Sequence, residues 1–354
     1  MKPTFNRWRP MSKAPSSPAL RSPRTSFQQL SLIVVGCLAV FLFAGSVVAE
    51  TCMTADEMDA NTRAALENTG KRFYGMVVQG DAASLRQNSI PAVANDFGGI
   101  EAAVNDNKAV LATGKVTSRP PYLLQAGGTQ PLQRAEFYCG IFNSPDRVGF
   151  VIPNLPPGNY AVVIEDVSTD KGPYTVSFVL QQVGQDWKLG GFYVKSGQVG
   201  GHDGNWFINK AQEFKNKGQR HNAYFYYWEA RELMAPVPFM GTSQLDKLYD
   251  ASQQVAPPDI PSNGPVDLVG SNGKTYKITQ IFPVNVGNDL DLVVKYQTPS
   301  ISDTGQTFTD NMAVIRGLVA KYPEYRDGFA AIVARAVEPS GRDYGSLLAM
   351  KDIK

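Results

Sequence analysis

The order of two hydrophobic periodicities limits the fold more than any other feature of this sequence. Residues 54–111 carry apolar side chains at helical spacing, beginning with Thr54 and Glu57 arranged as a capping box and broken at Gly80-Asp81. After Pro120-Pro121 the pattern changes to short strand-like segments separated by turn residues: 136–142, 148–153, 160–167, 174–183 and 187–195. Helices followed by consecutive antiparallel strands predict an α+β fold, with the helices on one face of a curved sheet.

The first 49 residues predict an export signal. Six basic residues and no acidic residue precede residue 30. Residues 30–48 then form an uncharged, mostly apolar run, and small residues lead up to Ala49. These are the parts of a secretory signal, so we expect cleavage between Ala49 and Glu50 and a periplasmic or secreted protein. Residues 30–48 are also about long enough to span a bilayer, which leaves a membrane-anchored protein as the alternative. An acylation box at Cys37 is disfavoured because little apolar sequence precedes it.

Removal of the signal changes the charge of the chain. Six of the 34 basic residues are lost, which leaves 28 against 32 acidic residues and a net charge of −4. A negative chain lacks the electrostatic attraction that drives nucleic-acid binding, so we expect no nucleic-acid partner. Cys52 and Cys139 remain, and in an oxidising compartment such a pair predicts a disulfide. The alternative is that Cys139 is a buried core thiol.

Residues 50–200 contain motifs typical of one known superfamily. Phe73-Tyr74 followed by Gly80-Asp81, and later Gly184 to Leu189 leading into the last strand, resemble the nuclear-transport-factor-two superfamily. The resemblance implies the cone fold shared with ketosteroid isomerase, whose members hold ligands or protein partners in the cone. An all-β alternative exists for about 120–200, because residues 150–160 resemble a turn of carboxypeptidase-regulatory β-sandwiches.

Enzymes of this superfamily place an acid or histidine base and a tyrosine in the cone, so the resemblance directs attention to such pairs. Tyr160 and Asp166 lie six residues apart on one predicted strand, which puts both side chains on the same face. They are the candidate catalytic pair, although Glu165 and Tyr138 have similar chemistry and no motif selects among them. The alternative reading is a core tyrosine and a solvated acid at a strand end.

Residues 203–255 predict a helical segment. Small and large residues from Ala211 to Ala230 match the spacing of a tetratricopeptide-like helical hairpin, in a single copy that should dock on its neighbours. Five consecutive aromatic residues occupy 224–228, and a helix points them all around its axis. Tyr224, Phe225 and Trp228 are therefore candidates for a partner-binding surface, with core packing as the alternative.

The last third of the chain follows a proline-rich linker at 256–265. Asn272-Gly273 predicts a hairpin turn, and 289–297 alternates as a strand with one buried face. Asp310 is expected to cap a helix and Pro323 to begin another that carries Phe329, Ile332 and Val333. Residues 266–354 thus predict a small α+β domain of unrecognised family.

The functional prediction rests mainly on missing motifs. The sequence has no nucleophile elbow, phosphate loop, dinucleotide fingerprint or redox cysteine pair, so we expect no cofactor. His202 and His221 lack the spacing of metal ligands. The sequence therefore predicts an exported, non-catalytic envelope protein that binds a partner protein or a small apolar ligand. The alternative is a cone-site isomerase, dehydratase or hydrolase acting on a small apolar molecule.

Overall fold

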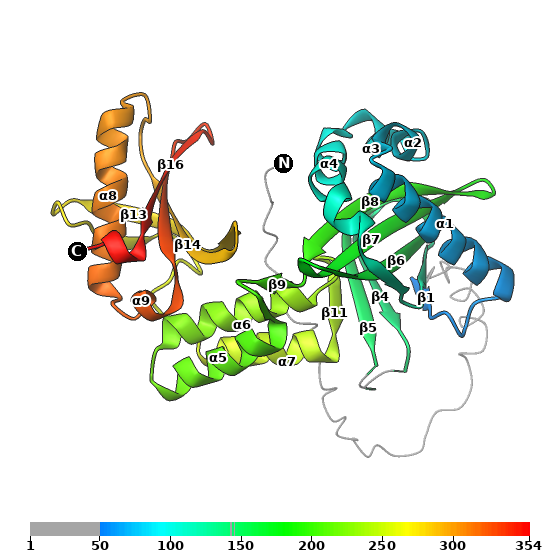
Figure 1. Cartoon of the computed structure of the whole chain (residues 1–354), viewed down its shortest axis with the longest axis horizontal. Helices are drawn as coiled ribbons and strands as arrows, with labels where there is room; N and C mark the ends of the chain where they lie inside the picture. The colour runs from blue at the N-terminus through cyan, green and yellow to red at the C-terminus, as the bar shows by residue number, and fades with distance from the viewer. Residues whose placement is uncertain (1–49, 142–143, 145) are drawn as a thin grey trace, which may run out of the picture.

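The computed structural model describes residues 50–141, 144 and 146–354, so the predicted signal, its cleavage after Ala49 and the acylation alternative at Cys37 lie outside the described residues. Within them, helices and largely antiparallel sheets are mixed, which confirms the predicted α+β class. Two sheet-containing modules lie at opposite ends with helices between them (Figure 1). We call residues 50–196 the first module, 198–255 the middle module and 266–354 the last module.

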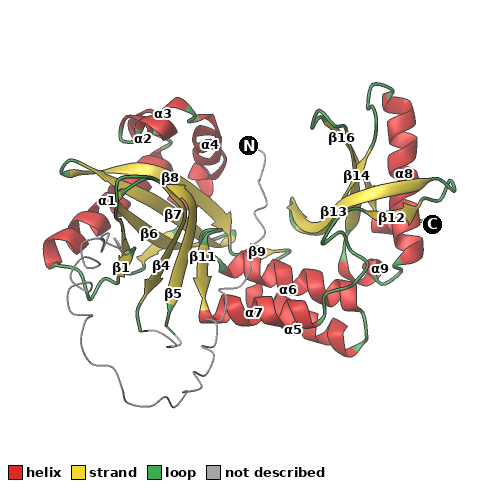
Figure 2. Cartoon of the chain, turned by 180° about the vertical axis from the view of Figure 1, so that it is seen from behind, coloured by secondary structure: helices red, strands yellow, loops and turns green. Residues whose placement is uncertain are grey.

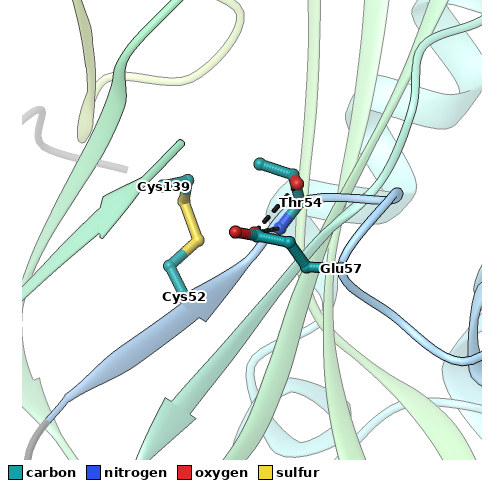
Figure 3. Close-up of a disulfide and its surroundings, with 4 residues drawn as sticks. All are labelled: Cys52, Thr54, Glu57 and Cys139. Atoms are coloured by element: carbon teal, nitrogen blue, oxygen red, sulfur yellow. Dashed lines mark hydrogen bonds between the residues drawn. A yellow bond between two sulfur atoms is a disulfide. The ribbon is translucent and has the colours of Figure 1, made fainter. Parts of the chain in front are cut away.

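Helices cover one side of the first module. They are α1 (Ala60–Gln79), α2 (Ala82–Gln87), α3 (Pro91–Asn95) and α4 (Gly98–Ala112). The predicted start of α1 at Thr54 is wrong, because Asp59 caps this helix by accepting hydrogen bonds from the amides of Asn61 and Thr62. Thr54 does bond to Glu57, but its hydroxyl acts as a donor to the carboxylate (2.9 Å) and caps no helical amide (Figure 3). The helix ends at Gly80, as predicted, with a left-handed φ of 70°.

The predicted single curved sheet is two sheets. A six-stranded sheet has the order β1-β3-β6-β7-β8, with β2 also pairing with β6, and a three-stranded sheet has the order β11-β5-β4. The strands are β1 (Thr51–Met53), β2 (Lys115–Ser118), β3 (Tyr122–Ala126), β4 (Leu132–Cys139), β5 (Val148–Leu155), β6 (Gly158–Thr169), β7 (Gly172–Val183), β8 (Asp186–Ser196) and β11 (Met240–Thr242).

The six-stranded sheet buries both of its faces. Successive side chains of β6 point to opposite faces, so Val163 packs under the helices with Phe73, whereas Val162 packs with Phe150 of the three-stranded sheet. The first module therefore has three layers: helices, large sheet and small sheet (Figure 1). The all-β alternative for 120–200 does not account for the helical layer, whose helices supply seven of the 18 buried residues of the core on that face.

The predicted disulfide between Cys52 and Cys139 is confirmed. The two Cα atoms are 5.0 Å apart, and the bridge spans 87 residues of sequence. Cys52 lies on β1 of the large sheet and Cys139 ends β4 of the small sheet, so the bridge ties the two sheets together near the start of the described chain (Figure 3).

The middle module is built from a two-stranded hairpin and three helices. Its elements are β9 (Gln198–Val199), β10 (His202–Asp203), α5 (Gly204–Asn216), α6 (Arg220–Met234) and α7 (Ser243–Gln254). Between α6 and α7 the chain contributes β11 to the small sheet of the first module. Side chains of α5 and α6 share one hydrophobic cluster with the last module, so the middle module is anchored on both sides.

The last module has one mixed sheet covered by a long helix. The sheet order is β12-β13-β14-β15-β16, and only the β14–β15 pair is parallel, because α8 crosses between those strands. The elements are β12 (Val266–Val269), β13 (Thr275–Val286), β14 (Asp289–Gln297), α8 (Thr304–Lys321), α9 (Tyr325–Gly328), β15 (Ala331–Val337), β16 (Asp343–Ala349) and the 3-10 turn Met350–Asp352.

Two predictions for the last module are wrong. Asp303, not Asp310, caps the helix by accepting from the amide of Gln306, and Asp310 instead lies within α8. The helix expected to carry Ile332 and Val333 is the strand β15, because its backbone groups pair with β14 on one side and β16 on the other. Tertiary pairing decides the conformation of such a short apolar segment.

Candidate functional site

The structure places the predicted catalytic pair in two separate environments. Tyr160 is buried between the two sheets of the first module, and its hydroxyl donates to the carbonyl oxygen of Pro156 at 2.9 Å. Asp166 accepts two hydrogen bonds from the guanidinium of Arg119, at 2.7 and 2.8 Å. Each side chain is thus engaged by its own partner. Neither bond connects the tyrosine to the acid.

The acid best placed for chemistry in the first module is Glu165. It is completely buried on the helical face of the large sheet, and burial raises the pKa of its carboxyl, offset in part by Ser118 and Lys71. Space for it exists because residue 70 is glycine: a Cβ there would lie 3.2 Å from the carboxylate oxygen Oε1. The surrounding face is occupied by packed side chains, including Phe73 and Phe178 in edge-to-face contact.

The aromatic residues 224–228 of α6 lie mostly in the core. The predicted binding surface is therefore wrong at Phe225. Phe225 is completely buried and packs against Tyr325 and Phe329 of the last module. A buried ring cannot present a surface to a partner. Tyr224 and Trp228 are half-buried and contact each other edge to face, so the run mainly joins the middle and last modules.

A cleft of about 340 Å³ lies where the middle and last modules meet. We call it the junction cleft. Its walls include His202, Trp206 and Tyr226 from the middle module and Asp289, Arg326 and Asp327 from the last module. The volume falls in the range of small-molecule sites in proteins. Figure 2 shows this region, where α5 and α6 run below β13 and α9.

The first wall of the cleft is set by a tight turn. Gly200 and Gly201 both have positive φ, 60° and 77°, as a two-residue hairpin turn between β9 and β10 requires. The turn leads into His202 and then Asp203, whose side chain caps α5 by accepting from the amide of Trp206 at 2.9 Å. Because His202 and Trp206 are four residues apart at the start of the helix, their rings stack at 3.8 Å with an interplanar angle of 8°.

The second wall comes from the last module. Asn288 and Asp289 lie at the turn between β13 and β14, and a Cβ added to Gly200 would be 3.3 Å from the Asn288 carbonyl oxygen. The two turns therefore approach each other closely. Arg326 and Asp327 lie on α9, which is held to α6 because the hydroxyl of Tyr226 donates to the carbonyl of Gly328 at 2.7 Å.

Two ionisable groups from different modules lie on or against α6: Glu229 is buried and Lys195 is half-buried. Burial raises the pKa of Glu229 on α6 to about 7, against the lowering effect of a hydrogen bond with Asn285 of β13. Lys195 of β8 donates to the carbonyls of Glu232 and Ala235 at the end of α6. Burial lowers its pKa, and the nearby Glu232 and Glu229 oppose that shift. These contacts tie α6 to both outer modules.

Residue His221, at the other end of α6, also links the modules. Its two ring nitrogens lie 2.7 Å from a carboxylate oxygen of Glu324 and 2.9 Å from one of Asp259.

The described residues contain no group of three or more ligand side chains suited to a metal ion. Among the helices of the described chain, none combines the length and apolar character that crossing a membrane requires.

Comparison with protein-family models, curated proteins and solved structures finds no match to this chain. Sequence reasoning missed the junction cleft, because its two walls come from distant parts of the chain. The Gly200-Gly201 turn and the four-residue spacing of His202 and Trp206 were the local signals that could have identified one wall.

Proposed function

We propose that this chain is an exported, non-catalytic binding protein whose ligand site is the junction cleft. The observation that carries the proposal is the stacked pair of His202 and Trp206. This pair lines a cleft of about 340 Å³ whose other wall carries polar groups of the last module. Flat aromatic walls combined with a few convergent polar groups are typical of small-molecule sites. A small ligand fits this geometry better than the protein partner that the sequence also allowed.

Export is supported by the Cys52–Cys139 disulfide, because such bridges persist mainly in oxidising compartments. We propose a periplasmic or secreted location on this basis together with the N-terminal sequence pattern. We also propose that the first module is a relative of the cone fold, since helices α1–α4 cover one face of its large sheet. The close packing of α5 on α6, with Phe214 and Tyr226 in edge-to-face contact, supports a tetratricopeptide-like hairpin.

A cone-site enzyme remains the second candidate because of Glu165. This buried carboxyl has a raised pKa and lies on the face of the sheet where the resemblance places a catalytic base. Tyr74, whose hydroxyl donates to the Leu111 carbonyl, lies near enough for the Glu165 charge to contribute to raising its pKa, after burial itself. The packed side chains around Glu165 favour the binding function.

The test is a fragment screen by ligand-observed NMR on the oxidised chain beginning at Glu50. We expect fragments that bind the wild type and lose binding in His202→Ala. His202 is exposed, so its replacement leaves the core intact. Lys115→Ala, exposed on β2 of the first module, is the surface control. Hits that respond to Glu165→Gln and not to His202→Ala would support the cone-site enzyme and overturn the cleft proposal.

A further inference from the structure

The polar groups around the junction cleft carry charges of both signs. Asp289 and Asp327 supply carboxylates, Arg326 supplies a guanidinium, and Asn288 supplies an amide. Asp327 already accepts a hydrogen bond from Gln219 at 2.6 Å, and Arg326 donates to the Met350 carbonyl at 3.4 Å. A ligand bearing a full charge of either sign would therefore meet a group of like charge in the same small cleft.

The remaining wall favours a ligand with a flat, weakly polar face. The imidazole of His202 lies over the indole of Trp206, and both rings line the cleft. Aromatic faces attract the C–H groups of a saturated ring as well as other π systems. A ligand that combines an apolar face with edge groups that both donate and accept hydrogen bonds is complementary to these walls.

We infer that the junction cleft binds a neutral, hydroxyl-rich ring, namely one sugar unit of a carbohydrate. Such a ring has an apolar C–H face that can lie against the His202–Trp206 wall. Its hydroxyls can donate to the carboxylates of Asp289 and Asp327 and accept from the guanidinium of Arg326. A volume of about 340 Å³ is at the lower end for ligand sites, which suits one ring rather than an extended peptide.

This inference rests on the proposed function, because it names the ligand class of the same cleft. The probes are glucose and N-acetylglucosamine, which are neutral, together with glucosamine and glucuronate, which place a positive or a negative charge on a similar ring. Saturation-transfer NMR and titration of tryptophan fluorescence on the oxidised chain beginning at Glu50 measure binding. We expect at least one neutral sugar to bind with an affinity about tenfold or more above its charged analogues.

Two cleft variants and two matched controls test where the sugar binds. Asp289→Asn removes a charged acceptor and should weaken sugar binding about tenfold or more, and His202→Ala should weaken it several-fold. Asp186→Asn at the start of β8 and Arg316→Ala on α8, both exposed, should leave it unchanged.

The outcomes separate this inference from the function on which it rests. Binding of only glucosamine or glucuronate, lost in His202→Ala, would overturn the neutral-sugar inference and leave the cleft as a binding site. Sugar binding that His202→Ala and Asp289→Asn both leave unchanged would also overturn the inference, since the sugar would then bind elsewhere. If no sugar binds and no screened fragment responds to His202→Ala, the sugar inference and the proposed function both fail.

Discussion

Replacing Glu229 by glutamine should remove a pH dependence that the fold creates at the joint between modules. Glu229 is 4% exposed, and burial raises the pKa of its carboxyl from 4.5 to about 7. Below pH 4.5 both the folded and the unfolded chain carry this proton, so the group has no effect on stability. Between pH 4.5 and about 7 the unfolded chain loses the proton first. The unfolding free energy therefore falls as pH rises through this window.

The size of the effect follows from the two pKa values. At about 1.4 kcal/mol for each pKa unit, ionisation of Glu229 lowers the unfolding free energy by about 3 kcal/mol at high pH, and by about 2.5 kcal/mol between pH 5 and pH 8. Glutamine has a similar shape and can keep the hydrogen bond with Asn285, but it does not ionise. The unfolding free energy of Glu229→Gln minus that of the wild type should thus rise by about 2.5 kcal/mol from pH 5 to pH 8.

Urea unfolding followed by tryptophan fluorescence at pH 5, 6, 7 and 8 measures this difference, since carboxyls distant from Glu229 titrate equally in both chains. Glu101→Gln on the exposed face of α4 is the control, and its difference from the wild type should stay constant with pH. If Glu229→Gln behaves as this control does, Glu229 is ionised and solvated in the fold, and the reasoning about its burial is refuted.

Three further changes test the packing of the modules. Replacing Cys52 and Cys139 by alanine opens an 87-residue loop and should lower the unfolding free energy by up to about 4–5 kcal/mol; an unchanged urea midpoint without reductant would contradict this. Phe225→Ala leaves a cavity at a completely buried site and should cost about 3–5 kcal/mol in urea unfolding, whereas a surface ring would cost far less. Gly70→Ala places a Cβ 2.5 Å from a valine methyl of β6, so calorimetry should show a lower melting temperature from a cost of about 1–3 kcal/mol. Gly75→Ala on the same helix, where the added Cβ meets nothing within 4 Å beyond the neighbouring residues and backbone of its own helix, should show no such loss.

Local signals in the sequence predicted much of the secondary structure. The strands from 148 to 195, the end of α1 at Gly80 and the turn at Asn272-Gly273 all depend on short-range preferences of the chain. The Cys52–Cys139 pairing was also predictable, because only two cysteines follow the signal. Predictions failed where two local solutions compete, as at Thr54 against Asp59 and in the segment that became β15.

The sequence by itself determined the α+β class, the disulfide and the apolar face of β14, because these depend on residue type and on spacing along the chain. The expected solvent face of β14 is wrong at Asp291 and Val293, which are buried as well. Only the tertiary structure decided that β6 is covered on both faces, that Phe225 is core and that Glu229 is buried. It alone brought the His202–Trp206 stack opposite Asp289 and Arg326. The physical reason is that burial and the meeting of distant segments depend on which surfaces pack together, and neighbouring residues do not encode that choice.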